Sequence, residues 1–262
     1  MKYAFLTVDL EEFDSPIDFG GVVSHKDMFE VSRKGCVEML KILNSFKVRS
    51  TFFTTTAFPK ENPELIKKIV SGGHEIAFHG NVHKTDLPDL NEPDMMKYFR
   101  KHKKELEKLS ETKIVGFRNP KMRTPPYEVL KKNGIKYDSS LHPTYIPGFY
   151  NNFLKPTSIY DEHGILEIPV SVVPLVRFPF SWLWFRNFGV RYSKLCTKLA
   201  SYNEDFVNLY FHPWEFVDIS SFNMPVFIKR NSGNNMKRTF SEYIEWLIKQ
   251  DFDIIPIKEY IQ

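Results

Sequence analysis

The stretch AFLTVDLEEFD, residues 4–14, begins as an apolar run and ends in four carboxylates: Asp9, Glu11, Glu12 and Asp14. The apolar run predicts a buried strand over residues 3–8. Because side chains alternate along a strand, Asp9 and Glu11 are expected on the same side of it. Acidic groups at the end of a buried strand indicate either a solvated turn or one wall of a metal or acid–base site.

The composition is that of an ordinary globular protein. Of its 262 residues, 42% are hydrophobic and 26% charged, and the net charge of +4 is too small and dispersed to indicate a nucleic-acid partner. No apolar run reaches the ~18 residues that a membrane-spanning helix needs, and no leader-peptide pattern opens the chain. The two cysteines, Cys36 and Cys196, are expected to be reduced core residues, so we expect a cytoplasmic protein.

Strand-like runs alternate with helical patterns over most of the chain. The strands are predicted at residues 3–8, 50–55, 74–80, 113–120, 135–140, 164–171, 206–211 and 252–257. The helices are predicted at residues 33–46, 63–71, 92–109, 126–133 and 240–249. Ser32 and Asn62 are the expected N-caps of the first two helices, and residues 142–163 are expected to form a long ordered loop.

This alternation implies parallel strands that are covered by helices. About seven such strands can close into a barrel, and in barrels of this kind the functional residues lie at the carboxyl ends of the strands. The sequence shows no linker that would divide the chain, so we expect a single domain over residues 1–262.

Polar groups collect where the predicted strands end, as a barrel site requires. Besides the first strand, such ends carry His79, Arg118, Asp138 and His212, and His83 follows His79 four residues later. Histidines at this spacing either are plain loop residues or bind one metal ion, for which imidazole is a suitable ligand. With one carboxylate they would leave positions open for water and substrate. His212, in an apolar run, is either a buried structural histidine or a general acid.

Seven segments in this order resemble the polysaccharide deacetylase superfamily, the NodB-type homology domain of carbohydrate esterases. They are TVDLEEFD, STFFTTTAF, PELIKKIVSGGHEIAFHGNVH, GFRNPKM, GIKYDSSLHP, LEIPVS and LYFHPWEF. The likeness is greatest to the subgroup found in bacterial exopolysaccharide and capsule gene clusters. It implies a distorted (β/α)7 barrel and metal-dependent hydrolysis of an N-acetyl group on an amino sugar of a glycan, or of an N-formyl group or cyclic amide.

The resemblance also implies catalytic roles for individual residues. Asp9 is similar to the catalytic base, and Arg118 to the arginine that positions this base. His212 is similar to the acid that protonates the leaving amine, and Asp138, in a looser match, to the acid that tunes that histidine. A catalytically weak carbohydrate-binding protein is the alternative from another class, although it would not need this set of residues.

His79 and His83 are similar to the metal-binding pair of the family. Many members have a second aspartate as the third ligand, but Leu10 stands in that place here. Glu11 is therefore the expected third ligand and Glu12 the alternative, while Asp14 is assigned to a solvated turn. Zinc is the expected cofactor, with cobalt or another divalent ion as a substitute.

The segment 174–192 is densely aromatic and is the part least similar to the family. Its large rings are expected in the core by default: Trp182, Trp184, Phe185 and Phe188. A sugar-stacking platform or a patch facing lipid is the alternative, because arginines lie among the rings at positions 177, 186 and 191. The substrate could then be a lipid-linked glycan, with the protein at the inner face of the membrane.

Overall fold

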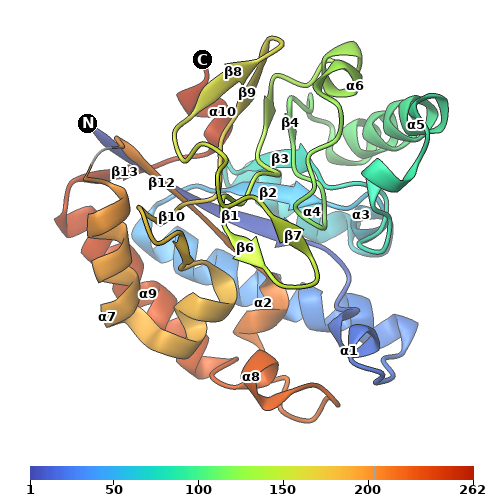
Figure 1. Cartoon of the computed structure of the whole chain (residues 1–262). Helices are drawn as coiled ribbons and strands as arrows, with labels where there is room; N and C mark the ends of the chain where they lie inside the picture. Colours follow the sequence, from blue (N-terminus) through green and yellow to red (C-terminus); the bar gives the residue numbers. More distant parts are fainter. Residues whose placement is uncertain (203) are drawn as a thin grey trace.

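A mostly parallel sheet forms the centre of the computed structural model, which describes residues 1–202 and 204–262. Its strands follow the order β12-β1-β2-β3-β4-β5-β9-β8, and β13 also pairs with β1 (Figure 1). Only β8 is antiparallel to its neighbour. The strands are β1 (Lys2–Leu10), β2 (Thr51–Thr54), β3 (Glu75–Phe78), β4 (Gly116–Phe117), β5 (Tyr137–Asp138), β8 (Tyr160–Glu162), β9 (Ile165–Glu167), β12 (Phe206–Phe211) and β13 (Phe252–Ile254).

The sheet curls until the chain after β9 meets β12. There the backbone N–H of Ser171 donates to the carbonyl of Asn208 at 2.8 Å, and the Asn208 side chain donates to the carbonyls of Ile168 and Pro169. These bonds replace a regular ladder between β9 and β12. The distorted seven-stranded barrel predicted from the sequence is therefore confirmed, as a curled sheet that closes through single bonds.

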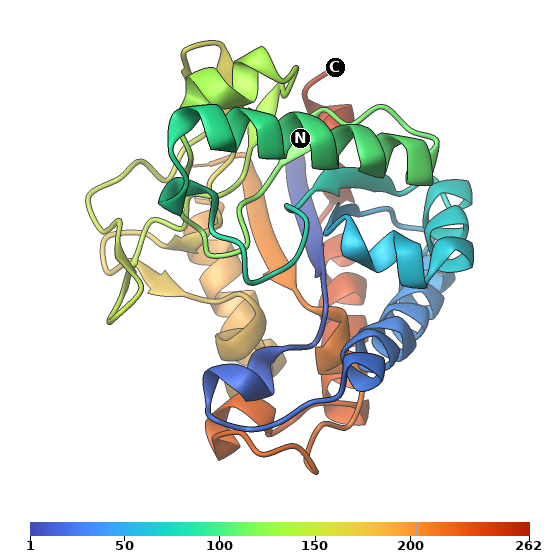
Figure 2. The ribbon, with the colours of Figure 1, turned by 90° about the vertical axis from the view of Figure 1, so that its right-hand side faces the viewer.

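Helices cover the outside of this sheet (Figures 1 and 2). The longer ones are α2 (His25–Phe46), α4 (Pro63–Ser71), α5 (Glu92–Ser110), α7 (Trp182–Ala200) and α9 (Asn234–Lys249). The short ones are α1 (Ser15–Asp18), α3 (Ala57–Glu61), α6 (Tyr127–Lys132), α8 (Val226–Lys229) and α10 (Ile257–Tyr260), with 3-10 turns η1 (Leu87–Asp89) and η2 (Pro213–Phe216). Two hairpins lie outside the barrel: β6 (Tyr145–Ile146) with β7 (Tyr150–Asn151), and β10 (Val172–Val173) with β11 (Phe178–Pro179).

The two faces of β1 bury different residues. Leu6, Val8 and Leu10 belong to the large core between the sheet and the helices, whereas Phe5 belongs to the cluster inside the barrel. Because side chains alternate, Thr7 and Asp9 continue the inner face that Phe5 begins. The strand thus carries its carboxylate into the barrel and not toward the helices.

Three predicted elements differ from the structure. Helix α2 begins at His25, so Ser32 is a buried residue within it, and the N-cap is Ser24, whose Oγ accepts from the N–H of Asp27 at 3.1 Å. Helix α9 begins six residues earlier than predicted, at Asn234. Residues 142–163, predicted as a loop, contain the β6–β7 hairpin and strand β8.

Helix α7 was not predicted at all. Its 19 residues include a Gly189 with φ 78° and ψ −177°, which interrupts the helical backbone. Bulky aromatic side chains, which have poor helix propensity, fill its first half, and apolar residues on its outer side remove the usual polar face. No helix within the described ranges is long and apolar enough to cross a membrane.

Candidate active site

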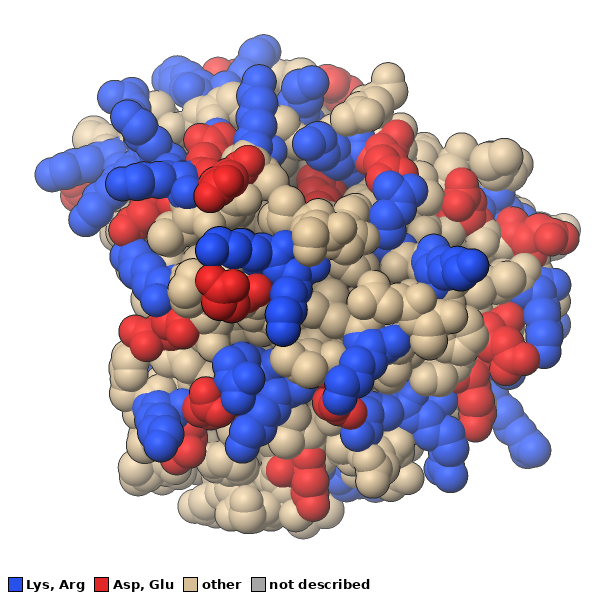
Figure 3. Space-filling view, turned by 180° about the vertical axis from the view of Figure 1, so that it is seen from behind, with Lys and Arg blue, Asp and Glu red and all other residues tan. Residues whose placement is uncertain are grey.

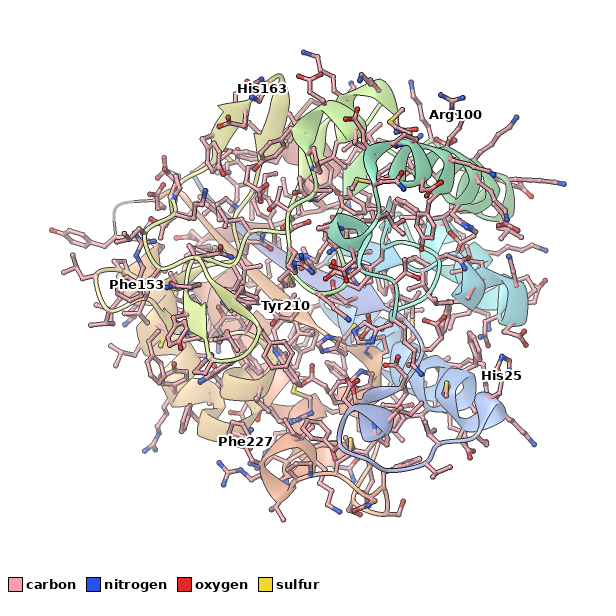
Figure 4. All side chains as sticks on the ribbon, turned by 45° about the vertical axis from the view of Figure 1, so that its right-hand side comes forward. His25, Arg100, Phe153, His163, Tyr210 and Phe227 are labelled. Carbon is pink, nitrogen blue, oxygen red and sulfur yellow. The ribbon has the colours of Figure 1, made fainter. Side chains whose placement is uncertain are left out.

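The ends of β1, β3, β4 and β12 bring the predicted polar residues to one end of the barrel. Figure 4 looks toward this region, where Tyr210 of β12 lies near the middle of the view. Asp9, Glu11, His79 and Arg118 are nearly inaccessible to solvent there. Charged groups at such depth are costly unless they are paired, so the arrangement of their partners defines the chemistry of the site.

Asp9 and Arg118 form a buried ion pair. The Arg118 Nη1 atom lies 2.8 Å from Asp9 Oδ1 and also donates to Thr7 Oγ1 at 2.8 Å. Ser139 holds the other side of the guanidinium through its carbonyl and its hydroxyl, each at 2.9 Å. Burial by itself would raise the pKa of Asp9, but the charge of Arg118 holds that pKa below its ordinary value.

Glu11 faces three imidazole rings. Its Oε2 lies 3.2 Å from His79 Nε2, and its Oε1 lies 3.7 Å from His83 Nε2 and 3.8 Å from His212 Nε2. These rings come from the end of β3, from the loop after it and from the end of β12. Glu11 is thus the carboxylate around which the predicted histidines gather.

The Nδ1 atoms of His79 and His83, which point away from Glu11, each have a hydrogen-bond partner. His79 Nδ1 donates to the carbonyl of Arg118 at 2.8 Å, since a carbonyl only accepts, and Nε2 is therefore the ring nitrogen that faces Glu11. His83 Nδ1 lies 2.7 Å from Asp14 Oδ1. The expectation that Asp14 is a solvated turn residue is wrong, because this side chain is buried and orients His83.

This donor set suits a divalent cation. His79 Nε2 and Glu11 Oε2 face each other at 3.2 Å, and either a proton on the ring or a cation bound by both atoms would satisfy this contact. Burial alone would lower the pKa of His83, but Glu11 and Asp14 raise it to about 10, which shows the demand for positive charge here. Within residues 1–202 and 204–262, no three His, Cys, Asp or Glu side chains are arranged so that they could hold a metal ion as they stand, so the fit lies in the chemistry of the donors.

In the described residues, Glu12 forms no ion pair with a histidine ring, unlike Glu11. Its Oε2 accepts from Thr55 Oγ1 at 3.2 Å, and its Oε1 is buried with no hydrogen-bond partner. Desolvation raises the pKa of Glu12 to about 7. The geometry therefore favours Glu11 over Glu12 as the carboxylate that a metal ion would meet.

His212 is held by side chains that the sequence motifs did not predict. Glu215 accepts from the backbone N–H of His212 at 2.8 Å and lies 3.4 Å from its Nδ1. Arg186 of α7 pairs with the other oxygen of Glu215 at 3.1 Å, and both side chains are fully buried. The sequence feature that could have revealed this contact is the glutamate three residues after the histidine in FHPWEF. This spacing is typical of a capping box, which His212 and Glu215 form across η2.

Two indole rings fix the plane of the His212 ring. Trp214 stacks on it with centroids 5.0 Å apart and 19° between the planes, and Trp182 meets it edge-on at 5.0 Å. Burial alone would lower the pKa of His212, but Glu215 and Glu11 raise it above its ordinary value. A histidine kept protonated in this way is suited to donate a proton.

Asp138 is the predicted site residue that the structure places elsewhere. Its Oδ1 accepts from Ser140 Oγ at 2.6 Å, and desolvation raises its pKa beside the buried carboxyl of Glu167. In the described part of the chain no hydrogen bond or ion pair joins Asp138 to His212. The contact expected of Asp138 is made instead by Glu215.

A hollow of roughly 700 Å³ lies between α2 and the start of α9. Its lining includes Arg33, Lys34, Phe216 and Lys237 and none of the residues described above. The candidate site is therefore distinguished by its ionisable groups and not by the size of its cavity.

A barrel that gathers ionisable groups at the carboxyl ends of its strands places this protein among the (β/α) barrels that carry their sites there. Residues 25–137 match the family model of polysaccharide deacetylases, and residues 139–262 match that of a domain of unknown function, DUF3473. The chain thus contains a polysaccharide deacetylase family domain, as its motifs predicted.

One curated relative and several solved structures are similar to this chain. A chitooligosaccharide deacetylase of Sinorhizobium fredii is 41% identical over 54 residues, which are 21% of this chain and 23% of that protein. The match thus spans less than a quarter of the relative's length.

Three solved structures share the fold at low identity. A Mycobacterium smegmatis protein assigned as a polysaccharide deacetylase has a TM-score of 0.67 at 18% identity, with 98% of this chain and 88% of that chain covered. An allantoinase, PuuE, has a TM-score of 0.66 at 15% identity, with 97% and 87% covered. A CE4 family pseudoenzyme from Bacillus anthracis has a TM-score of 0.59 at 13% identity, with 100% and 66% covered.

Proposed function

We propose that this protein is a metal-dependent amide hydrolase that removes N-acetyl groups from an amino sugar of a glycan or glycan precursor. The observation that carries the proposal is the cluster in which Glu11 faces three imidazoles beside the buried Asp9–Arg118 pair. The match to the polysaccharide deacetylase model and the chitooligosaccharide deacetylase relative support the substrate class.

Glu11, His79 and His83 would hold the metal ion. Two nitrogens and one carboxylate form the donor set that zinc takes in catalytic sites, and cobalt accepts the same ligands. A bound divalent ion would polarise the amide carbonyl and lower the pKa of a water molecule. Asp14 and the Arg118 carbonyl would keep the two rings turned with Nε2 toward the ion.

Asp9 is the proposed general base. Arg118 keeps it ionised and takes Oδ1, while Oδ2 makes no hydrogen bond to the described residues. That free oxygen would accept the proton of the water that attacks the amide carbon. His212 would then give its Nε2 proton to the departing sugar amine, so that the C–N bond breaks and acetate leaves.

Acetate release is the direct test. Purified protein, stripped of metal and reloaded with zinc or cobalt, is incubated with N-acetylated chito-oligosaccharides, and free acetate is measured beside Asp9→Ala. We expect release by the wild type and none by the variant. Equal release by both would reject the assignment of Asp9, and no release with any metal would reject the deacetylase function.

The alternatives give different products in the same assay. An N-formyl hydrolase would release formate from formylated amino sugars, and a cyclic-amide hydrolase would open a ring without releasing either acid. A carbohydrate-binding protein without activity would bind the oligosaccharide and release nothing. The presence of an allantoinase and of a pseudoenzyme among proteins of this fold makes these controls necessary.

A further inference from the structure

The outward side of α7 is apolar where a surface helix is usually polar. Leu195 and Leu199 lie one turn apart in the part of α7 that follows Gly189, Phe188 lies just before that break, and Tyr202 follows the helix end. These four side chains are between 45% and 85% exposed. We call this line of residues the α7 face.

The tip of the β10–β11 hairpin extends the α7 face. Its Leu175 and Val176 are 90% and 64% exposed. The hairpin is fastened to α7 because Tyr192 donates from its hydroxyl to the carbonyl of Pro179 at 2.6 Å. Figures 1 and 4 place the hairpin and α7 on the same side of the molecule, with Phe153 of the neighbouring loop at its edge.

The backbone conformation of Leu175 indicates that a leucine at this position does not stabilise the folded protein. Its φ of 67° lies in the left-handed region, which glycine and asparagine adopt far more easily than leucine does. A leucine there is strained and also exposes its whole side chain to water. Both costs are avoided by an asparagine, so the apolar tip is explained better by a contact with a partner.

The segment that carries the α7 face is basic. Residues 168–203 contain five basic residues and no aspartate or glutamate. Arg191 and Lys198 of α7 are exposed, and in the described part of the chain neither takes part in an ion pair. The back of the molecule, seen in Figure 3, interleaves acidic and basic side chains. An apolar surface with exposed, unpaired basic residues beside it complements an anionic lipid surface, although Glu204 and Asp205 follow its Tyr202 end.

We propose that the α7 face docks on an anionic lipid bilayer, with Leu175 and Val176 inserted between the headgroups. The sequence suggested a lipid contact through the aromatic segment 174–192, of which the structure buries Phe185 and Arg186 but exposes Phe188 and Arg191. The surface assigned here keeps Phe188, which was expected in the core but is 51% exposed, and adds residues outside that suggestion. The helix that carries this surface begins at the candidate site, because the ring centroid of Trp182, its first residue, lies 5.0 Å from that of His212.

This position also indicates the substrate class. A protein docked through the α7 face would meet glycans that are carried on a lipid, with the sugar reaching the barrel end beside Trp182. This second part rests on the proposed function, whereas the docking itself does not.

Vesicle sedimentation tests the docking. The full chain is mixed with vesicles of phosphatidylcholine alone or with about a third of phosphatidylglycerol. We expect binding to the anionic vesicles that weakens with added salt, and little binding to the neutral ones. Arg191→Gln and Lys198→Gln should each weaken the binding about five-fold at low salt.

The apolar part is tested by Leu175→Asn and Leu195→Gln. Each should weaken binding about ten-fold if the leucine is fully buried in the bilayer. Leu175→Asn is also expected to melt no lower than the wild type, because asparagine accepts its backbone conformation. Val22→Asn, at a site that is likewise 90% exposed but lies before α2, is the matched control and should bind as the wild type does.

The results separate the docking from the reaction. Absence of binding to anionic vesicles, or equal binding by Leu175→Asn and the wild type, overturns the docking. A dimer that Leu195→Gln dissociates in sedimentation also overturns it, since a second copy then covers the face. Acetate release from soluble oligosaccharides by Leu175→Asn should equal that of the wild type. If neither protein releases acetate although the wild type binds the vesicles, the proposed function is rejected and the docking proposal is retained.

Discussion

Neighbouring glutamates at the end of β1 should respond in opposite ways to the same substitution. Glu11 faces His79 and His83, whereas Glu12 contacts Thr55 and leaves one buried oxygen without a partner. Glu11→Gln and Glu12→Gln each change one oxygen for an amide group and keep the size of the side chain. The pair therefore tests which carboxylate binds metal without a difference in packing.

The structure sets the magnitude for each variant. Loss of an outer partner of a metal ligand costs about 10–100-fold in affinity, so loss of a ligand itself by Glu11→Gln should cost at least that much. Glu12→Gln should leave the affinity within a few-fold of the wild type. The rise of the Glu12 pKa from 4.5 to about 7 corresponds to about 3 kcal/mol.

The sign of this stability term follows from proton linkage. Between pH 4.5 and about 7 the folded metal-free protein binds the Glu12 proton more tightly than the unfolded chain does. The contribution of Glu12 to stability is thus full at low pH and is lost as the pH rises through that window. Glu12→Gln, which does not titrate, should therefore be more stable than the wild type at pH 8, by up to about 3 kcal/mol.

Metal content and affinity are measured by elemental analysis and by competition with a chromogenic chelator, and stability by urea unfolding of the metal-free proteins. Retention of metal by Glu11→Gln together with its loss in Glu12→Gln would refute the assignment drawn from the geometry. A wild type that binds no divalent ion would refute the metal site altogether.

Three further changes test other contacts. Asp14→Asn should weaken metal binding about ten-fold without abolishing it, since it perturbs the partner of His83 and not a ligand; an unchanged affinity would show that His83 needs no such partner. Asp9→Asn should lower the rate of acetate release by about 100-fold or more while metal content stays the same, and a parallel loss of metal would show that Asp9 is a ligand. Glu75→Gln should reduce the loss of stability between pH 5 and 7, because desolvation raises the pKa of the buried Glu75 to about 7, so that its stabilising protonation is lost as pH rises. Urea unfolding at several pH values checks this, and identical slopes in both proteins would contradict it.

Much of the site could be predicted from the ends of the strands. Asp9, His79, Arg118 and His212 each follow an apolar run, and parallel strands bring their carboxyl ends to one edge. Such runs are local in the sequence, and the alternation of helices and strands along the chain strongly restricts how the strands can be arranged in the sheet. The family-model match begins at residue 25 and so leaves out Asp9, which the strand pattern nevertheless places in the site.

The partners of these residues could not be predicted in the same way. Asp14 reaches His83 across 69 positions, and Arg186 reaches Glu215 from a helix that the sequence did not reveal. A side chain that is polar and lies in a turn is expected in water unless the fold covers it. Only the packing of α7 and of the chain before α2 decides that these charges are buried and paired.

The sequence by itself determined the barrel, the family and the set of ionisable residues at its carboxyl end, because strand length, alternation and motif order are local properties of the chain. The tertiary structure alone placed Glu11 and not Glu12 against the histidine rings, left Asp138 without a contact to His212, and left an apolar face on α7. Those outcomes depend on distances between segments far apart in the sequence, where a difference of a few ångströms decides whether a carboxylate meets an imidazole or a threonine.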